Sequence, residues 1–237
     1  MKSSRILFLG LAVALGSLAY SNGLGTGIAT PGSPHNFADD IGAPELPTTG
    51  GWNGREEICR VCHVPHDHNQ AAMYGTNGLL WNHEVSSATY TMYSSVTLDG
   101  AIDSQPTGVA KMCLGCHDGT VGVDTFDKYA GGLVFIGDYA AGYQVPGALY
   151  GSSLASTHPI SIDYDEVADP GLHPKTALMG ASGTIADVLE NGKVQCSSCH
   201  DVHDQPGESV AGTHLLRVSQ KASQGPASGL CLSCHIK

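Results

Sequence analysis

The stretch Cys196-Ser197-Ser198-Cys199-His200 sets the structural class of this protein, because its pattern C-x-x-C-H occurs four times along the chain. The other copies are Cys59-Arg60-Val61-Cys62-His63, Cys113-Leu114-Gly115-Cys116-His117 and Cys231-Leu232-Ser233-Cys234-His235. The four copies contain all eight cysteines of the 237-residue chain. The eight thiols are therefore expected to serve one repeated purpose.

The pattern C-x-x-C-H is the attachment signature of c-type haem. The two thiols add to the two vinyl groups of one haem, and the spacing of two residues lets the backbone turn so that both reach. The histidine that follows presents its imidazole to the iron as the proximal ligand. Four covalent haems are predicted, with the proximal ligands His63, His117, His200 and His235.

Paired cysteines have two common uses other than haem attachment. Such pairs bind structural zinc, and in an oxidising compartment they form disulfides. A single pair would leave both interpretations open. Here a histidine follows the second cysteine in all four copies, although the chain has only 12 histidines. This recurrence favours haem.

The composition agrees with a fold organised around cofactors. Only 6% of the residues are aromatic and 14% are charged, while 31 are glycine. Large side chains normally bury the area that offsets backbone entropy, so this chain would form a weak core by itself. The expected fold class is therefore a multihaem cytochrome c, mostly loop and turn, with short helices and a few short strands around four haems.

The net charge indicates which partners the protein binds, and the first residues indicate where in the cell it is directed. The net charge is −11 and there is no basic run, which is not typical of a nucleic-acid-binding protein. Residues 1–19, or 1–21, have the pattern of an export signal, with Lys2 and Arg5 before an apolar stretch that ends in small residues. That stretch is too short for a lasting membrane anchor. The mature chain is expected to be exported, without a membrane span.

The chain is also an internal duplication. Each half carries the longer pattern C-x-x-C-H-x-x-H, at Cys59–His66 and at Cys196–His203, followed by a second C-x-x-C-H. Each half begins with a histidine beside a proline, His35 and His158. The predicted organisation is a first di-haem half over 20–130, a Gly- and Tyr-rich insertion over 131–157 and a second di-haem half over 158–237. Helices are expected over 56–66 and 184–191, and strands over 90–93, 131–137 and 160–164.

The duplication also selects distal ligands. His35, His66, His158 and His203 occupy matching places in the two halves, one for each haem. His66 and His203 each lie three residues after a proximal histidine, so on a helix they share its face and should ligate a different haem. His83 is the main alternative distal ligand. Methionine ligands are less favoured, and three further histidines are expected at the surface or beside propionates: His68, His173 and His214.

Several segments resemble the multihaem cytochromes c with doubled C-x-x-C-H motifs. They are Ser33–Phe37, Cys59–His66, Leu80–His83, Cys113–Val121, His158–Ile160, Cys196–His203 and Leu215–Ser219 leading to Cys231–His235. By size and haem count the chain is similar to exported tetrahaem cytochromes of anaerobic respiration that polymerise into extracellular filaments, the OmcE-like nanowires.

This resemblance implies low-potential bis-histidine haems stacked in a chain, and electron transfer rather than catalysis. It also implies self-association into a filament, in which one subunit donates a histidine to the next, and contacts with other redox cytochromes and extracellular electron acceptors. The alternatives are a soluble periplasmic tetrahaem carrier and a multihaem oxidoreductase with one open haem.

Overall fold

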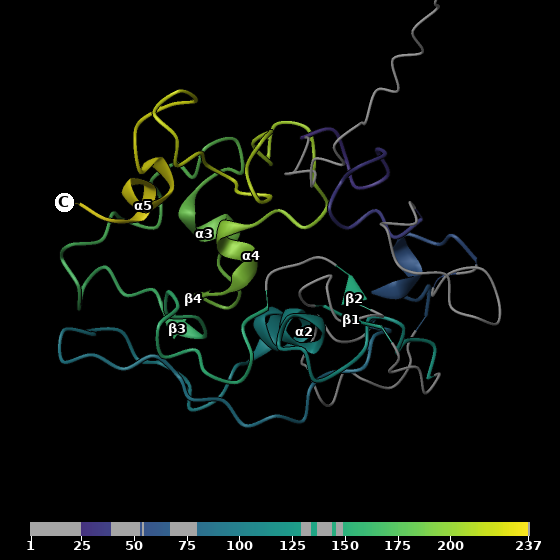
Figure 1. Ribbon diagram of the computed structural model, residues 1–237. Helices are drawn as coiled ribbons and strands as arrows, with labels where there is room; N and C mark the ends of the chain where they lie inside the picture. Colours follow the sequence, from purple (N-terminus) through teal and green to yellow (C-terminus); the bar gives the residue numbers. More distant parts are fainter. Residues whose placement is uncertain are drawn as a thin grey trace, which may run out of the picture.

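The computed structural model describes residues 25–38, 53, 55–66, 80–128, 134–136, 144–145 and 149–236. The predicted export signal lies outside these ranges. The described chain consists mostly of loops and turns, which is compatible with the expected fold class (Figure 1). Its regular elements are η1 Cys59–Val61, α2 Gly108–His117, β1 Phe135–Ile136, β2 Gln144–Val145, β3 Ile162–Asp163, α3 Ile185–Val188, β4 Lys193–Val194, α4 Cys196–Cys199 and α5 Gly229–Cys234.

Each C-x-x-C-H motif lies on a helical segment: η1, the end of α2, α4 and α5. A helical turn places residues three apart on one face, which is what two thiols sharing one group require. Backbone hydrogen bonds close three of these turns from the histidine N–H to the carbonyl of the first cysteine, at 2.7 Å for His63, 3.1 Å for His200 and 2.9 Å for His235.

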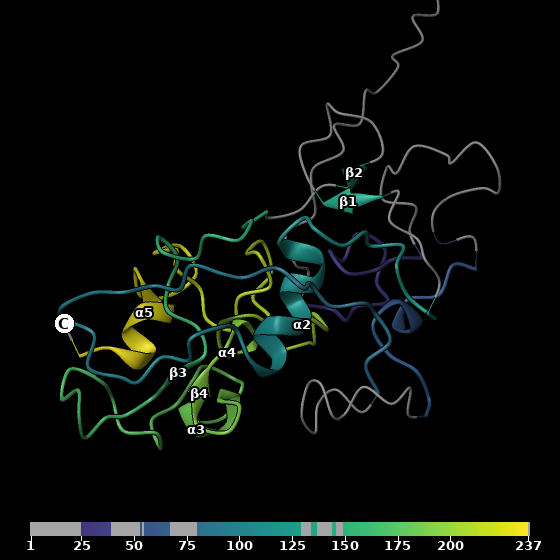
Figure 2. The same cartoon turned by 90° about the horizontal axis from the view of Figure 1, so that it is seen from below.

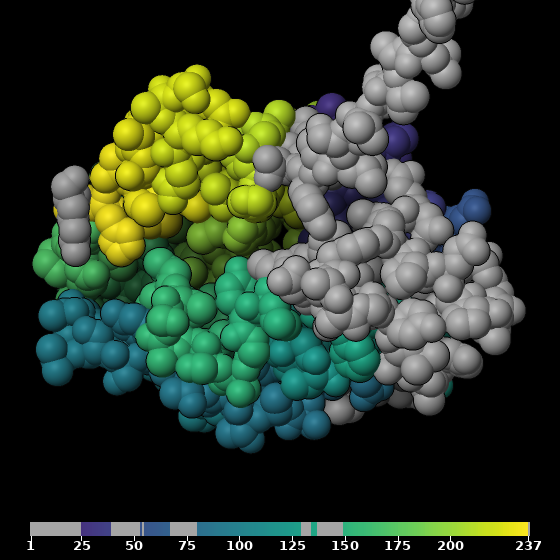
Figure 3. All heavy atoms as spheres, in the orientation of Figure 1, coloured from purple at the N-terminus to yellow at the C-terminus, as the bar shows by residue number. Residues whose placement is uncertain are grey.

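The four motif helices follow one another across the molecule in the order of the sequence. In both ribbon views α5, α4 and α2 succeed each other from the C-terminal side, and the blue turn of η1 lies beyond α2 (Figures 1 and 2). In the space-filling view the yellow-green residues near 200 are recessed between the yellow C-terminal segment and the teal and green segments (Figure 3). The motifs thus form a row.

Helix α2 is the longest helix among the described residues. It buries Ala110, Met112 and Leu114, and the last two pack into different apolar clusters. Its C-cap residue Asp118 accepts hydrogen bonds from the Tyr90 hydroxyl at 2.5 Å and from the Thr120 backbone N–H at 2.8 Å. The end of α2, where His117 lies, is therefore held by a buried carboxylate.

The apolar core of the described residues is divided into small clusters. One contains Val123, Val134 and Ile136, a second contains Val85 and Met112, and a third is built on Tyr90, Leu114 and Leu154. Such clusters are small because the sequence supplies few large apolar side chains. This thin core agrees with the expectation drawn from composition.

The regular elements are shorter than predicted. The helix expected over 56–66 is the three-residue turn η1, and the helix expected over 184–191 is α3, capped by Thr184 and Asp187. The strand expected over 90–93 is wrong, since only an isolated bridge at Thr91 forms there. Short turns replace these elements because the backbone of each segment hydrogen-bonds to a loop elsewhere in the chain, as Val64 does to Leu80, Thr91 to Ser152 and Ile185 to Ala177.

Two small sheets complete the described elements. Strands β3 and β4 pair antiparallel with Ile162 opposite Val194, and β1 and β2 pair parallel. The strand expected over 160–164 is reduced to β3, and that expected over 131–137 to β1. No helix within the described residues is both long and apolar enough to cross a membrane.

Candidate haem-binding sites

Three pairs of imidazole rings face each other in the structure. The ring centroids of His35 and His117 are 6.3 Å apart, with an interplanar angle of 77°. The rings of His63 and His203 lie 6.5 Å apart, and those of His158 and His235 lie 6.4 Å apart. Each pair joins a predicted proximal histidine to a predicted distal one.

These separations can be compared with what an iron atom between two imidazoles requires. With metal–nitrogen bonds of about 2.0 Å, and each ring centroid about 1.1 Å behind its nitrogen, imidazoles on opposite sides of a metal have centroids roughly 6.2 Å apart. All three observed separations agree with this value to within a few tenths of an ångström. The pairs therefore fit bis-histidine ligation of a haem iron.

One of the three pairs joins the two halves of the chain. His203 comes from the second C-x-x-C-H-x-x-H motif and faces His63 of the first. The ring of His203 thus contacts a motif histidine other than His200, its neighbour three residues earlier. His35 lies near the N-terminal end of the described chain and faces His117 at the end of α2.

Backbone carbonyls select the ring nitrogen that is left free. Nδ1 of His35 donates to the carbonyl of Val202 at 3.3 Å, and Nδ1 of His158 donates to the carbonyl of Pro159 at 2.9 Å. Nδ1 of His200 donates to the carbonyl of His214 at 2.7 Å. Because a carbonyl only accepts, the proton lies on Nδ1, and Nε2 keeps the lone pair that a metal needs.

The surroundings also favour the neutral imidazole at His35, His63 and His200. Burial, and then the neighbouring His117, lower the pKa of His35 to about 4. Burial lowers the pKa of His63 and of His200 as well. A neutral imidazole is the ligating form, so low pKa values suit axial ligands at neutral pH.

The structure leaves some predicted ligands without an imidazole partner. Neither His200 nor His66 has a ring contact with another histidine among the described residues. His66 is exposed. The predicted distal role of His66 stays a prediction, and His68 lies outside the described residues.

His83 occupies a different kind of place. Its side chain is completely buried, and both ring nitrogens lie against backbone carbonyl oxygens: Nδ1 is 2.7 Å from that of Glu84 and Nε2 is 3.0 Å from that of Gly122. Burial lowers its pKa. A neutral imidazole has one N–H, so one of these carbonyls accepts it, and within the described residues the ring contacts no other imidazole.

The thiols of successive motifs lie near one another. Burial raises the pKa of Cys116, and the nearby Cys62 of the first motif raises it further. A hydrogen bond with Cys113, together with burial, raises the pKa of Cys196. The second motif therefore lies close to both the first and the third.

The fourth motif continues this row. Burial, Cys196 and Cys231 raise the pKa of Cys199 to about 11. Cys59 and Cys231 are the exposed cysteines, and the thiols between them are at least half-buried. All eight cysteines are unpaired. The two ends of the row are thus its most accessible parts.

Trp81 is a site residue that the sequence argument did not single out. Its indole packs edge-on against His63, with ring centroids 5.8 Å apart. Its Nε1 is buried without an acceptor in the described part of the chain, and so is the Ser33 hydroxyl close to His35. Unpartnered polar atoms beside two of the imidazoles are what a bound group with propionate oxygens would satisfy. The position of Trp81 in Leu80–His83 was the available signal.

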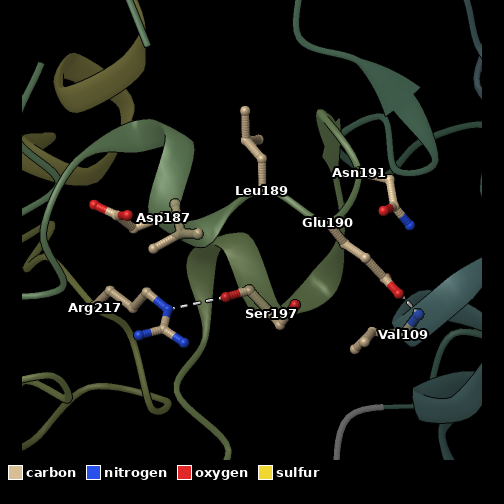
Figure 4. Close-up of a pocket in the computed structure, with 8 residues that line it drawn as sticks. Val109, Asp187, Leu189, Glu190, Asn191, Ser197 and Arg217 are labelled. Atoms are coloured by element: carbon tan, nitrogen blue, oxygen red, sulfur yellow. Dashed lines mark hydrogen bonds between the residues drawn. The ribbon is translucent and has the colours of Figure 1, made fainter. Parts of the chain in front are cut away.

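A pocket of about 320 Å³ lies beside the third motif, between α3 and α4 (Figure 4). On one side Glu190 accepts a hydrogen bond from the Val109 N–H at the start of α2, at 2.7 Å. On the other side Arg217 Nε donates to the Ser197 carbonyl at 2.9 Å. The charged groups of this pocket are engaged in holding the second and third motifs.

No cluster of three or more His, Cys, Asp or Glu side chains in the described ranges could bind a metal ion by itself. A haem iron takes four of its ligands from the porphyrin and needs only two from the protein, a number that one imidazole pair could supply. No protein-family model matches the chain, and no curated protein matches it.

Proposed function

We propose that this protein is an exported tetrahaem c-type cytochrome that transfers electrons along four closely spaced haems, as a subunit of an extracellular filament in anaerobic respiration. The observation that carries the proposal is the set of three imidazole pairs at 6.3, 6.5 and 6.4 Å. Each pair combines the histidine of a C-x-x-C-H motif with one from a distant segment.

The residues of each site have distinct roles in this proposal. The eight motif cysteines would bind the haems covalently, and the paired imidazoles would be axial ligands. When bound, a haem supplies an iron that takes up and releases one electron. The carbonyls of Val202, Pro159 and His214 hold the Nδ1 protons of His35, His158 and His200, which leaves Nε2 for the iron.

The order of the motifs supports a directional path. Cys62 lies near Cys116, and Cys199 lies near Cys231. Between these two pairs, Cys113 and Cys196 are joined by a hydrogen bond. Groups attached at these thiols would be separated by short gaps, which rapid electron transfer requires. The accessible ends, at Cys59 and Cys231, are the proposed places of electron entry and exit.

A filament would place these ends against neighbouring subunits or other redox cytochromes. The alternative is a soluble periplasmic tetrahaem carrier, and the net charge of −11 favours it, because like charges oppose self-association at low salt. Electron microscopy of the secreted fraction distinguishes the two. Filaments built from this chain support the proposal, and a monodisperse monomer supports the carrier.

The axial assignment is tested by substituting one distal histidine in the holoprotein. In His158→Leu the iron opposite His235 loses a ligand, so one of four haems is expected to become high-spin in the ferric electron paramagnetic resonance spectrum. His173→Leu is the control and should leave the spectrum unchanged. A wholly low-spin spectrum in His158→Leu, or a wild-type protein without four haems by mass, contradicts the proposal.

A further inference from the structure

The segment Leu80–Glu84 binds the first motif through its backbone. The Val64 N–H donates to the Leu80 carbonyl at 2.9 Å, and the Asn82 N–H donates to the Cys62 carbonyl at 2.9 Å. The Asn82 side chain also donates to the carbonyl of Arg60, inside η1. The segment is therefore attached to both ends of the first haem-attachment turn.

The same segment contacts the second motif on its other side. Nε2 of His83 lies 3.4 Å from Sγ of Cys116. The approach is close because the adjacent helical residue is Gly115, where an added Cβ would lie only 2.8 Å from the Glu84 carbonyl oxygen. The segment thus packs backbone to backbone against α2, next to the thiol.

The imidazole of His83 is fixed in this position. It is completely buried, its two nitrogens face the carbonyls of Glu84 and Gly122, and an isolated bridge joins His83 to Phe126. The neutral ring has one N–H, which one of these carbonyls accepts, and no other imidazole among the described residues contacts it. Its Nε2 lies 3.4 Å from Sγ of Cys116 and can hold that sulfur in place.

We propose that His83 is a positioning residue for the second haem: it holds the Cys116 sulfur, and Leu80–Glu84 acts as a brace that fixes the second attachment site relative to the first. This inference rests on the proposed haem attachment at Cys113 and Cys116. His83 would thus act at the thioether bond between Cys116 and the haem, and not as an axial ligand of the iron.

The test compares His83→Gln and His83→Leu in the exported holoprotein with the wild type. Three quantities are measured: haems per chain by mass, spin state by electron paramagnetic resonance, and the four midpoint potentials by spectroelectrochemistry. Both variants should keep four haems per chain. Every haem that is low-spin in the wild type should also be low-spin in the variants. One midpoint potential should shift in His83→Leu and shift less in His83→Gln, since glutamine can still donate to the Gly122 carbonyl.

Two further variants make the result decisive. Gly115→Ala should shift the same potential, because its methyl group pushes α2 away from the brace. His35→Leu marks the signal of a lost axial ligand, a new high-spin haem. If a His83 variant loses the thioether at Cys116 alone, with the other seven intact, positioning is again supported.

A new high-spin haem in either His83 variant would show an axial role and overturn the inference. Four unshifted potentials in His83→Leu would also overturn it, because they would leave His83 with packing alone. These outcomes are separate from failure of the proposed function, which would appear as a wild-type protein without a haem on Cys113 and Cys116.

Discussion

At the scale of single residues, the chemistry of this protein depends on where histidine side chains are held. The sequence predicted His35, His158 and His203 as distal ligands by comparing the two halves, and the structure places each of them opposite a motif histidine. Comparing the two halves of the sequence could not predict which distal histidine pairs with which motif histidine. That depends on how the halves pack, which no local pattern records.

Asp127 is a residue whose importance only the structure reveals. Its carboxylate accepts hydrogen bonds from Arg60 at 2.8 Å and from Asn82 at 2.9 Å, and it pairs with Arg55. Although burial opposes ionisation, these hydrogen bonds lower the pKa of Asp127 to about 2. It thereby joins the first motif to the brace.

The lowered pKa of Asp127 predicts a pH dependence of stability. A free aspartate has a pKa of about 3.9, so the stabilisation by ionised Asp127 is complete above about pH 4 and is lost as the pH falls through about 2. Asp127→Asn should lower the urea midpoint at pH 7 and flatten its fall between pH 4 and pH 2. The measurement is urea unfolding followed by Soret circular dichroism, with exposed Asp99→Asn as control. If the urea midpoint of Asp127→Asn fell between pH 4 and pH 2 as steeply as that of the wild type, the prediction would be contradicted.

At the scale of elements, every helical segment except α3 contains all or part of a C-x-x-C-H motif, and among the described residues only α2 is longer than two turns. The sequence predicted a helix through the first motif and another over 184–191, but it did not predict α2, α4 or α5. Helix lengths could not be predicted either. The helix expected over 56–66 has only the three residues of η1, because the chain then pairs with Leu80 and Trp81 instead of continuing to coil.

The start of α2 gives a prediction at this scale. The Glu190 carboxylate accepts from the Val109 N–H at 2.7 Å, so it caps the first turn from the loop before α4. Glu190→Ala should reduce the free energy of unfolding by about 1 kcal/mol, as loss of a helix cap typically does. The check is the urea midpoint. Glu190→Gln keeps an acceptor and should lose less, and equal stability of the alanine variant would exclude a capping role.

At the scale of the whole molecule, the motifs form a row from η1 to α5 (Figure 2). Three small apolar clusters hold the described chain. In the proposed holoprotein the porphyrins add the missing apolar bulk. The duplication seen in the sequence does not make two separate units, since His63 of one half faces His203 of the other.

The net charge of −11 predicts how assembly responds to salt. Repulsion between subunits weakens as the Debye length falls from about 30 Å at 0.01 M to about 8 Å at 0.15 M ionic strength. The fraction of the protein in filaments should therefore rise over this range, as measured by sedimentation and electron microscopy. Filaments that dissolve when salt is added would instead indicate contacts between opposite charges.

The sequence by itself predicts the attachment chemistry, because two thiols and an imidazole within five residues would act through one local turn. It also determined that the core would be thin, because composition does not depend on the fold. Only the tertiary structure decided which histidines pair, that His83 lies against Cys116, and that the motifs form a row. These contacts join residues far apart in sequence, and they depend on packing between segments that no local pattern encodes.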